Sequence, residues 1–151
     1  MKLRIGFAAL LALAVSVFAN GATATQLDDG VKRIAFQVSD DAPGTMTKVL
    51  NNAANFASAM NEAGEDYIIE IVAYNAGLHM FRTDTSPVAE RMMNFPASVP
   101  NVQFSACGNT LAGMARKEGK EPELFDFVNV VPGGVVRLME LDTMGYFVIR
   151  P

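Results

Sequence analysis

The sequence contains only one cysteine and one histidine among its 151 residues. A single cysteine excludes a disulfide within the chain. A zinc site could draw only on His79, Cys107 and carboxylates. We therefore predict no metal site and no cofactor, and the lone thiol of Cys107 is the first residue of interest.

Positive charge is also scarce, with 12 Lys and Arg residues against 16 Asp and Glu residues. An acidic chain without a basic stripe lacks the charge that nucleic acids and anionic membranes attract. We predict that neither is a partner. Hydrophobic residues make up 50% of the chain, and this share excludes a disordered protein.

No apolar run reaches the length of a membrane anchor. The run at residues 5–19 is shorter than the ~20 residues that cross a bilayer. It follows a basic start and precedes the small residues Ala22-Thr23-Ala24, which is the pattern of a signal peptide. We predict a signal peptide over 1–24, export to the bacterial periplasm, no stable membrane insertion after cleavage, and one mature domain over 25–151. Ten basic and sixteen acidic residues then remain, a formal net charge of −6.

Strand and helix patterns alternate along the mature chain. Strands are predicted at residues 31–38, 67–74, 101–106, 127–131 and 146–149. Helical spacing of apolar residues predicts helices at residues 46–60, 87–95, 110–117 and 135–141. Gly64 is expected to end the first helix, while Ser86 should cap the second and Pro96 should end it. This order predicts an α/β fold: a single domain with a mostly parallel five-stranded sheet, helices on both faces and a flavodoxin-like strand order.

Two segments lie outside these elements. Asp40-Asp41 precedes the first helix, and a turn with N-cap residues at the start of that helix explains the pair better than cation binding does. The apolar segment Leu78-His79-Met80-Phe81 predicts either a lid over the core or a contact between subunits, and we favour the contact.

The functional crevice of an open α/β sheet lies beyond the carboxyl ends of its strands. The candidate residues there are Tyr74, Asn75, Cys107, Gly108, Asn109, Thr110, Gly133 and Gly134. Cys107 is the strong nucleophile among them. A thiol one tight turn before a helix receives backbone N–H donors and the positive end of the helix dipole, and both favour the thiolate. Gly108 allows a close backbone approach, and Asn109 or Thr110 can cap the helix. The alternative is a buried, inert cysteine.

Other polar residues offer weaker hypotheses. His79 could serve Cys107 as a general base or proton relay, or it could be a loop histidine beside apolar neighbours. Gly133-Gly134 could cradle an anion, although without a G-x-G-x-x-G pattern or a Walker lysine it fits close packing better. Arg82 and Arg116 could attract an anionic sulfur species, a role that most surface arginines do not have.

The segment Ala106-Cys107-Gly108-Asn109-Thr110 resembles the cysteine motif of the DsrE/DsrF-like family of sulfur-relay proteins. Further segments agree with this family in order and spacing: residues 71–78, 86–91, 131–135 and 145–151. The resemblance implies a compact α/β fold, assembly into homo-oligomers and, in some members, a cysteine that carries persulfide sulfur between partners. Cys107 stands at that cysteine's position, and the predicted export departs from the cytoplasmic relay members.

Three hypotheses for the function follow. The first is an exported sulfur-handling protein in which Cys107 accepts sulfane sulfur as a persulfide and relays it from a donor to a partner thiol. The second is a non-catalytic homo-oligomeric module that binds a ligand or protein and has a structural cysteine. The third, a thiol redox sensor, ranks last because the chain has no resolving cysteine.

Overall fold

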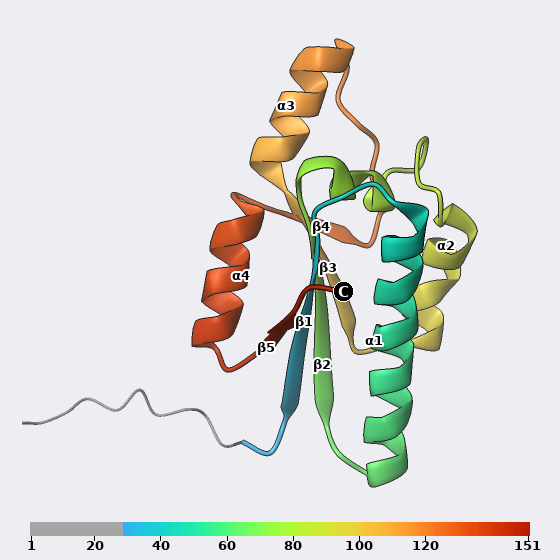
Figure 1. The fold of residues 1–151 in the computed structure, drawn as a ribbon, viewed down its shortest axis with the longest axis vertical. Coiled ribbons are helices and arrows are strands. Elements are labelled where there is room, and N and C mark those ends of the chain that lie inside the picture. The colour runs from blue at the N-terminus through green and yellow to red at the C-terminus, as the bar shows by residue number, and fades with distance from the viewer. Residues whose placement is uncertain (1–28) are drawn as a thin grey trace, which may run out of the picture.

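Residues 29–151 are described by a computed structural model, and they form one five-stranded sheet with the strand order β4-β3-β2-β1-β5 (Figure 1). All four strand pairings are parallel. The strands are β1 Lys32–Val38, β2 Tyr67–Ala73, β3 Val102–Cys107, β4 Val128–Val131 and β5 Phe147–Ile149. The predicted α/β class with a parallel five-stranded sheet is therefore confirmed. The predicted signal peptide lies outside the described residues.

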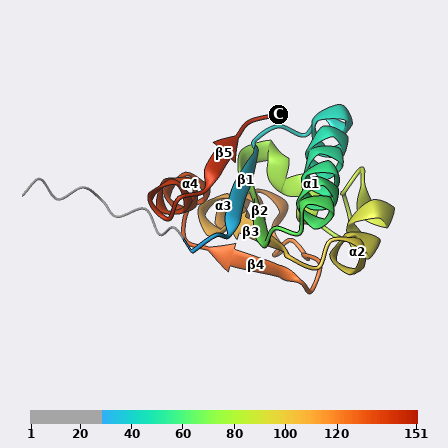
Figure 2. The same ribbon diagram turned by 90° about the horizontal axis from the view of Figure 1, so that it is seen from below.

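Helices cover both faces of the sheet, as predicted (Figure 2). They are α1 Pro43–Ala63, α2 Ala89–Ser98, α3 Gly108–Glu118 and α4 Gly134–Thr143, with the 3₁₀ helix η1 at Asn75–Phe81. Helices α1 and α2 lie on one face and α4 on the other, while α3 stands beyond the carboxyl edge of the sheet (Figure 1). No helix among residues 29–151 combines the length and the apolar character that crossing a membrane needs.

The expected flavodoxin-like order is wrong. That order is 2-1-3-4-5, whereas here the chain steps in one direction from β1 to β4 and then returns past β1 to add β5. Crossovers between parallel strands are right-handed, so reversing the direction of travel moves the connecting helix to the opposite face. The reversal follows β4, and α4 consequently lies alone on its face of the sheet.

The main core lies between the sheet and helices α1 and α2. Helix α1 contributes the apolar stripe that its sequence predicts, with these side chains buried: Met46, Val49, Leu50, Ala53 and Ala57. A smaller cluster under α4 consists of Ala35, Val72, Leu138 and Leu141. Gly64 ends α1 in the left-handed conformation, as expected.

Several local expectations were wrong. Pro96 lies inside α2, which continues to Ser98, because a proline in the last turn removes only one of the final hydrogen bonds. Ala42, and neither aspartate before it, is the N-cap of α1. The N-cap of α2 is Val88, while the Ser86 hydroxyl donates to the Met80 carbonyl at 2.8 Å.

The segment at residues 78–81 belongs to the core, contrary to the favoured subunit contact. Leu78, Met80 and Phe81 are fully buried in η1, and the Phe81 ring packs edge-on against Phe104. A 3₁₀ turn directs three of its four side chains inward here, and only His79 remains partly exposed.

A buried ion pair attaches α4 to the sheet. Glu70 of β2 is fully buried, and the Arg137 guanidinium donates to both of its carboxylate oxygens at 2.8 Å. The Ser105 hydroxyl donates a third hydrogen bond to Glu70 at 2.6 Å. Burial, and then the Glu70 charge, raise the pKa of the nearby Tyr146 phenol. This ion pair sets the position of α4, because the two parallel hydrogen bonds between guanidinium and carboxylate form only in a narrow range of orientations.

Replacing Arg137 by leucine should destabilise the protein by about 3 kcal/mol, because it leaves the Glu70 carboxylate buried without a partner. The double variant Glu70→Leu/Arg137→Leu should recover most of this loss. Urea denaturation of both variants measures the effect. A double variant that is as unstable as Arg137→Leu would contradict this explanation.

Candidate functional site

Eight of the nine residues predicted for the site line one pocket of about 900 Å³ at the carboxyl edge of the sheet. They are Tyr74, Asn75, His79, Cys107, Asn109, Thr110, Gly133 and Gly134. They meet because β2, β3 and β4 are adjacent and in register, with Ala73 beside Ala106 and Cys107 beside Val131. The ninth, Gly108, faces a smaller hollow on the other side of α3.

Cys107 lies where two helices begin. It is the last residue of β3 and the N-cap of α3, and the first residue of α4, Gly134, approaches it from β4. Helix N-termini present unpaired N–H groups and a partial positive charge. The thiol is only 6% exposed, so it lies at the inner wall of the pocket.

The surroundings of the thiol favour its ionised form. Burial is the largest single influence and raises the pKa of Cys107, but the Thr110 hydroxyl and the backbone N–H groups of Gly134, Thr110 and Asn109 together lower it below its usual value. The sulfur makes no side-chain cap hydrogen bond of ordinary geometry to the first turn of α3. These donors therefore act as close dipoles that stabilise negative charge on the sulfur.

Thr110 connects the thiol to the loop after β2. Its Oγ1 accepts a hydrogen bond from the Asn75 backbone N–H at 3.0 Å. Asn75 has a φ of 50°, the only positive value for a non-glycine residue within 29–151, and this conformation suits Asn better than most residues. This bond uses a lone pair of Oγ1 and leaves the hydroxyl proton available to donate to the sulfur.

Two glycines allow the loops around the pocket to approach each other. A Cβ atom at Gly134 would lie 2.9 Å from the Cβ of Tyr74, so only glycine lets α4 begin beside β2. A Cβ atom at Gly77 would lie 2.3 Å from the Val38 carbonyl oxygen. At Gly134 the structure thus supports close packing, the better fit of the two functions predicted for Gly133-Gly134.

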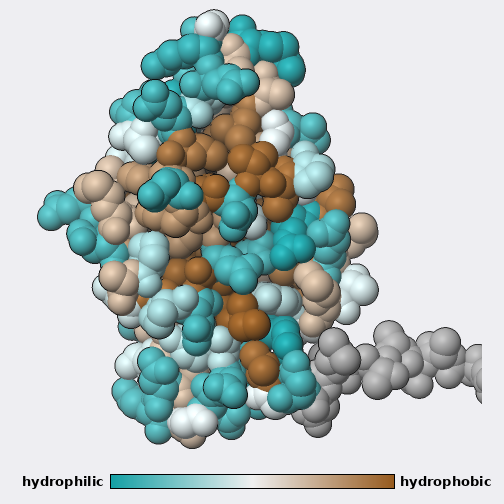
Figure 3. All heavy atoms as spheres, turned by 180° about the vertical axis from the view of Figure 1, so that it is seen from behind, coloured by the Kyte–Doolittle hydropathy of each residue, from teal (hydrophilic) through white to brown (hydrophobic). Residues whose placement is uncertain are grey.

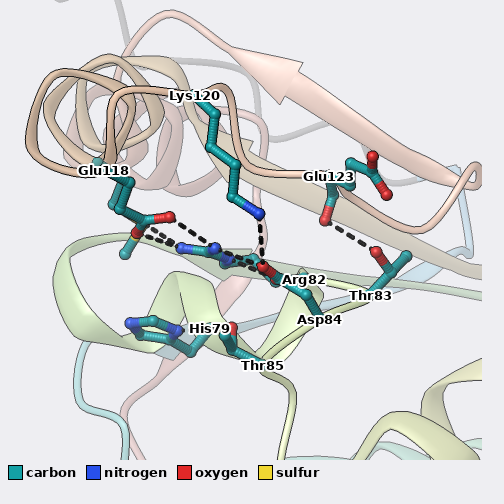
Figure 4. A network of polar contacts seen from close by, with 9 residues as sticks. His79, Arg82, Thr83, Asp84, Thr85, Glu118, Lys120 and Glu123 are labelled. Carbon is teal, nitrogen blue, oxygen red and sulfur yellow. Dashed lines mark hydrogen bonds and ion pairs between the residues drawn. The ribbon is translucent and has the colours of Figure 1, made fainter.

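His79 lines the pocket, but its ring is bonded elsewhere. Its Nδ1 shares a hydrogen bond of 2.7 Å with the Thr85 hydroxyl (Figure 4). No hydrogen bond joins His79 to Cys107 among the described residues. The geometry therefore supports a loop histidine more than a proton relay.

Arg82 is buried and paired, which argues against its predicted part in attracting an anion. It is 1% exposed, and its guanidinium donates to Asp84 at 2.8 and 2.9 Å and to Glu118 at 2.6 and 2.8 Å (Figure 4). The guanidinium holds the pKa of Asp84 at about 2. Arg116, by contrast, is exposed and lines the pocket next to Lys117.

Six further residues of α3 and α4 line the pocket and were not predicted from the sequence: Gly113, Met114, Lys117, Glu118, Val135 and Val136. Helical spacing from Asn109 would have placed Gly113 and Arg116 on the same side of α3, because residues three and four apart share a face. No group of three or more His, Cys, Asp or Glu residues in the described part of the chain could hold a metal ion.

The chain matches no family model and no curated protein. Its fold is similar to solved structures that include the protein of unknown function MTH1491 from Methanobacterium thermoautotrophicum. The two chains are 29% identical, and their superposition has a TM-score of 0.67 over 80% of this chain and 99% of that one. This likeness supports the α/β fold.

Replacing Gly134 by alanine should push the start of α4 away from β2, because the new Cβ would collide with Tyr74. We expect a loss of about 1–3 kcal/mol in unfolding free energy. Gly133→Ala is the matched control, since its nearest neighbour, a Val136 methyl, would lie at an ordinary 3.5 Å. Equal thermal stability of the two variants would contradict the close approach.

Replacing Thr110 by valine should raise the pKa of the Cys107 thiol, because it removes the hydroxyl donor while preserving side-chain size. The pH profile of thiol alkylation should move to higher pH. Thr110→Ser keeps the hydroxyl and should move it less. An unchanged profile for the valine variant would show that the hydroxyl does not act on the sulfur.

Proposed function

We propose that Cys107 is a sulfur carrier whose thiolate accepts sulfane sulfur and releases it to a partner thiol. The observation that carries this proposal is the position of the thiol, at the wall of an open pocket where the N-termini of α3 and α4 meet. A structural cysteine needs neither a pocket nor donors that lower its pKa.

The chemistry needs only a thiolate and a donor with a weak sulfur bond. With thiosulfate, the Cys107 thiolate attacks the outer sulfur, a new S–S bond forms at Cys107, and the S–S bond of the donor breaks to release sulfite. With a persulfide donor, the leaving group is the donor's thiolate. A partner thiolate then attacks the terminal sulfur, and the Cys107 thiolate is regenerated as the leaving group.

The pocket suits the anionic species in this cycle. Arg116 and Lys117 are exposed at its edge and supply positive charge to an otherwise acidic protein. A persulfide on Cys107 would place its terminal sulfur near the same backbone N–H groups that act on the thiol. The resemblance of residues 106–110 to the DsrE/DsrF-like cysteine motif supports the same function, and we propose export as its setting.

A homo-oligomer is also part of this proposal. Large apolar side chains are exposed on α4 beside the pocket, with Val135 and Met139 each 64% exposed and Val136 52% exposed. Apolar side chains also form a broken strip that runs down the middle of the molecule when it is seen from behind (Figure 3). Apolar surface of this kind is commonly covered by another protein chain.

The low exposure of Cys107 favours a second candidate, a binding module with a structural cysteine. A thiol that is 6% exposed offers little surface to a reagent. In that case the pocket would hold a ligand, and the cysteine would only pack against the core.

Exposing the purified mature protein to thiosulfate or polysulfide should add about one sulfur atom to its intact mass. The added sulfur should be released by cyanide and should be absent from Cys107→Ser, because the chain has no other cysteine. An unchanged mass, with a thiol that reacts only after denaturation, would contradict the carrier and support the binding module.

A further inference from the structure

Helix α3 is weakly supported by the core. None of its eleven residues is fully buried, although every other helix has buried side chains. The pocket of about 900 Å³ lies on one side of α3 and a hollow of about 340 Å³ on the other. Figure 1 shows the helix standing clear of the sheet. Packing alone therefore leaves the tilt of α3 poorly determined.

One arginine attaches the far end of α3 to the rest of the protein. Arg82 follows η1, and its guanidinium donates to both carboxylate oxygens of Glu118, the last residue of α3 (Figure 4). Its Nη1 also lies 3.8 Å from the Met114 sulfur, one turn earlier. Asp84 accepts two further hydrogen bonds from the same guanidinium, so the Arg82 side chain is held in one orientation.

We propose that Arg82 is a positioning residue for Cys107, because its ion pair with Glu118 sets the tilt of α3 and keeps the first-turn N–H groups of that helix directed at the sulfur. This inference rests on the reactive thiolate of the proposed function. An α-helix of eleven residues is a stiff rod about 16 Å long, so a constraint at one end acts on the other.

The near end of α3 lies close to β4 at Gly108, which follows Cys107 directly. A Cβ atom added at Gly108 would lie only 3.1 Å from the Val131 carbonyl oxygen. With this end packed against β4, release of the far end would let the helix rock about Gly108. Rocking would change the distances from the sulfur to the N–H groups of Asn109 and Thr110, which lie in the first turn.

The charged and titratable groups around the thiol define a sharp test. Those that line the pocket with Cys107 are Tyr74 after β2, His79 of η1, and Arg116, Lys117 and Glu118 of α3, while the lining from α4 is apolar. Removing the negative charge of Glu118 would, through its field alone, lower the pKa of a nearby thiol. Loss of the positioning of α3 would raise the pKa of the thiol. The two explanations thus predict changes of the thiol pKa in opposite directions.

We would titrate the thiolate in the full mature chain by its ultraviolet absorbance, with Cys107→Ser as the blank, and compare the wild type with Glu118→Ala. The midpoint should rise by about half a pH unit, the size expected when a thiolate loses helix N-terminal donors. Glu123→Ala is the matched control: it removes one carboxylate from the following loop and leaves the backbone hydrogen bond of Glu123 to Thr83 intact, so its midpoint should not rise.

A midpoint that falls or stays in place in Glu118→Ala would overturn the positioning role, because only the field of the carboxylate would then act on the sulfur. Persulfide loading of the wild type is measured in parallel. A protein that takes up no sulfur but still shows the upward shift would retain the positioning role and lose the carrier function. Circular dichroism shows whether α3 remains helical in each variant.

Discussion

The site depends on the parallel register of β2, β3 and β4 at their carboxyl ends. Ala73 pairs with Ala106 and Cys107 with Val131, so three loops leave the sheet at the same level. Each loop brings backbone groups to the sulfur of Cys107 or to Thr110 beside it. A shift of one residue in this register would turn the thiol to the other face of the sheet, because strand side chains alternate.

Two arginines hold the helices that begin at the thiol. Arg137 of α4 pairs with the buried Glu70, and Arg82 pairs with Glu118 at the end of α3. Both guanidiniums form two-pronged bonds with a carboxylate, which fix orientation as well as distance. Each ion pair acts on a helix whose N-terminus lies at Cys107. Of the four paired residues, only Glu118 also lines the pocket.

Much of the fold was readable from local pattern. The five strands and the stripe of α1 follow from alternation and helical spacing, and the candidate residues follow from the rule that strand ends form the crevice. Pro96 and residues 78–81 were misread because tertiary contacts override local preference: a helix can tolerate a late proline, and a short apolar turn can fill a core. The role of Arg82 was also misjudged, since its carboxylate partner Glu118 lies 36 residues away.

The alternation of strands and helices, the single thiol and its place at a strand end can all be read from the amino-acid sequence. These are local properties, set by side-chain spacing and by the chemistry of single residues. Long-range contacts, in contrast, set the strand order, the meeting of two helix N-termini at Cys107, and the partners of Glu70 and Arg82. Those features join residues distant in the chain, and many sequences with the same local pattern could satisfy them differently.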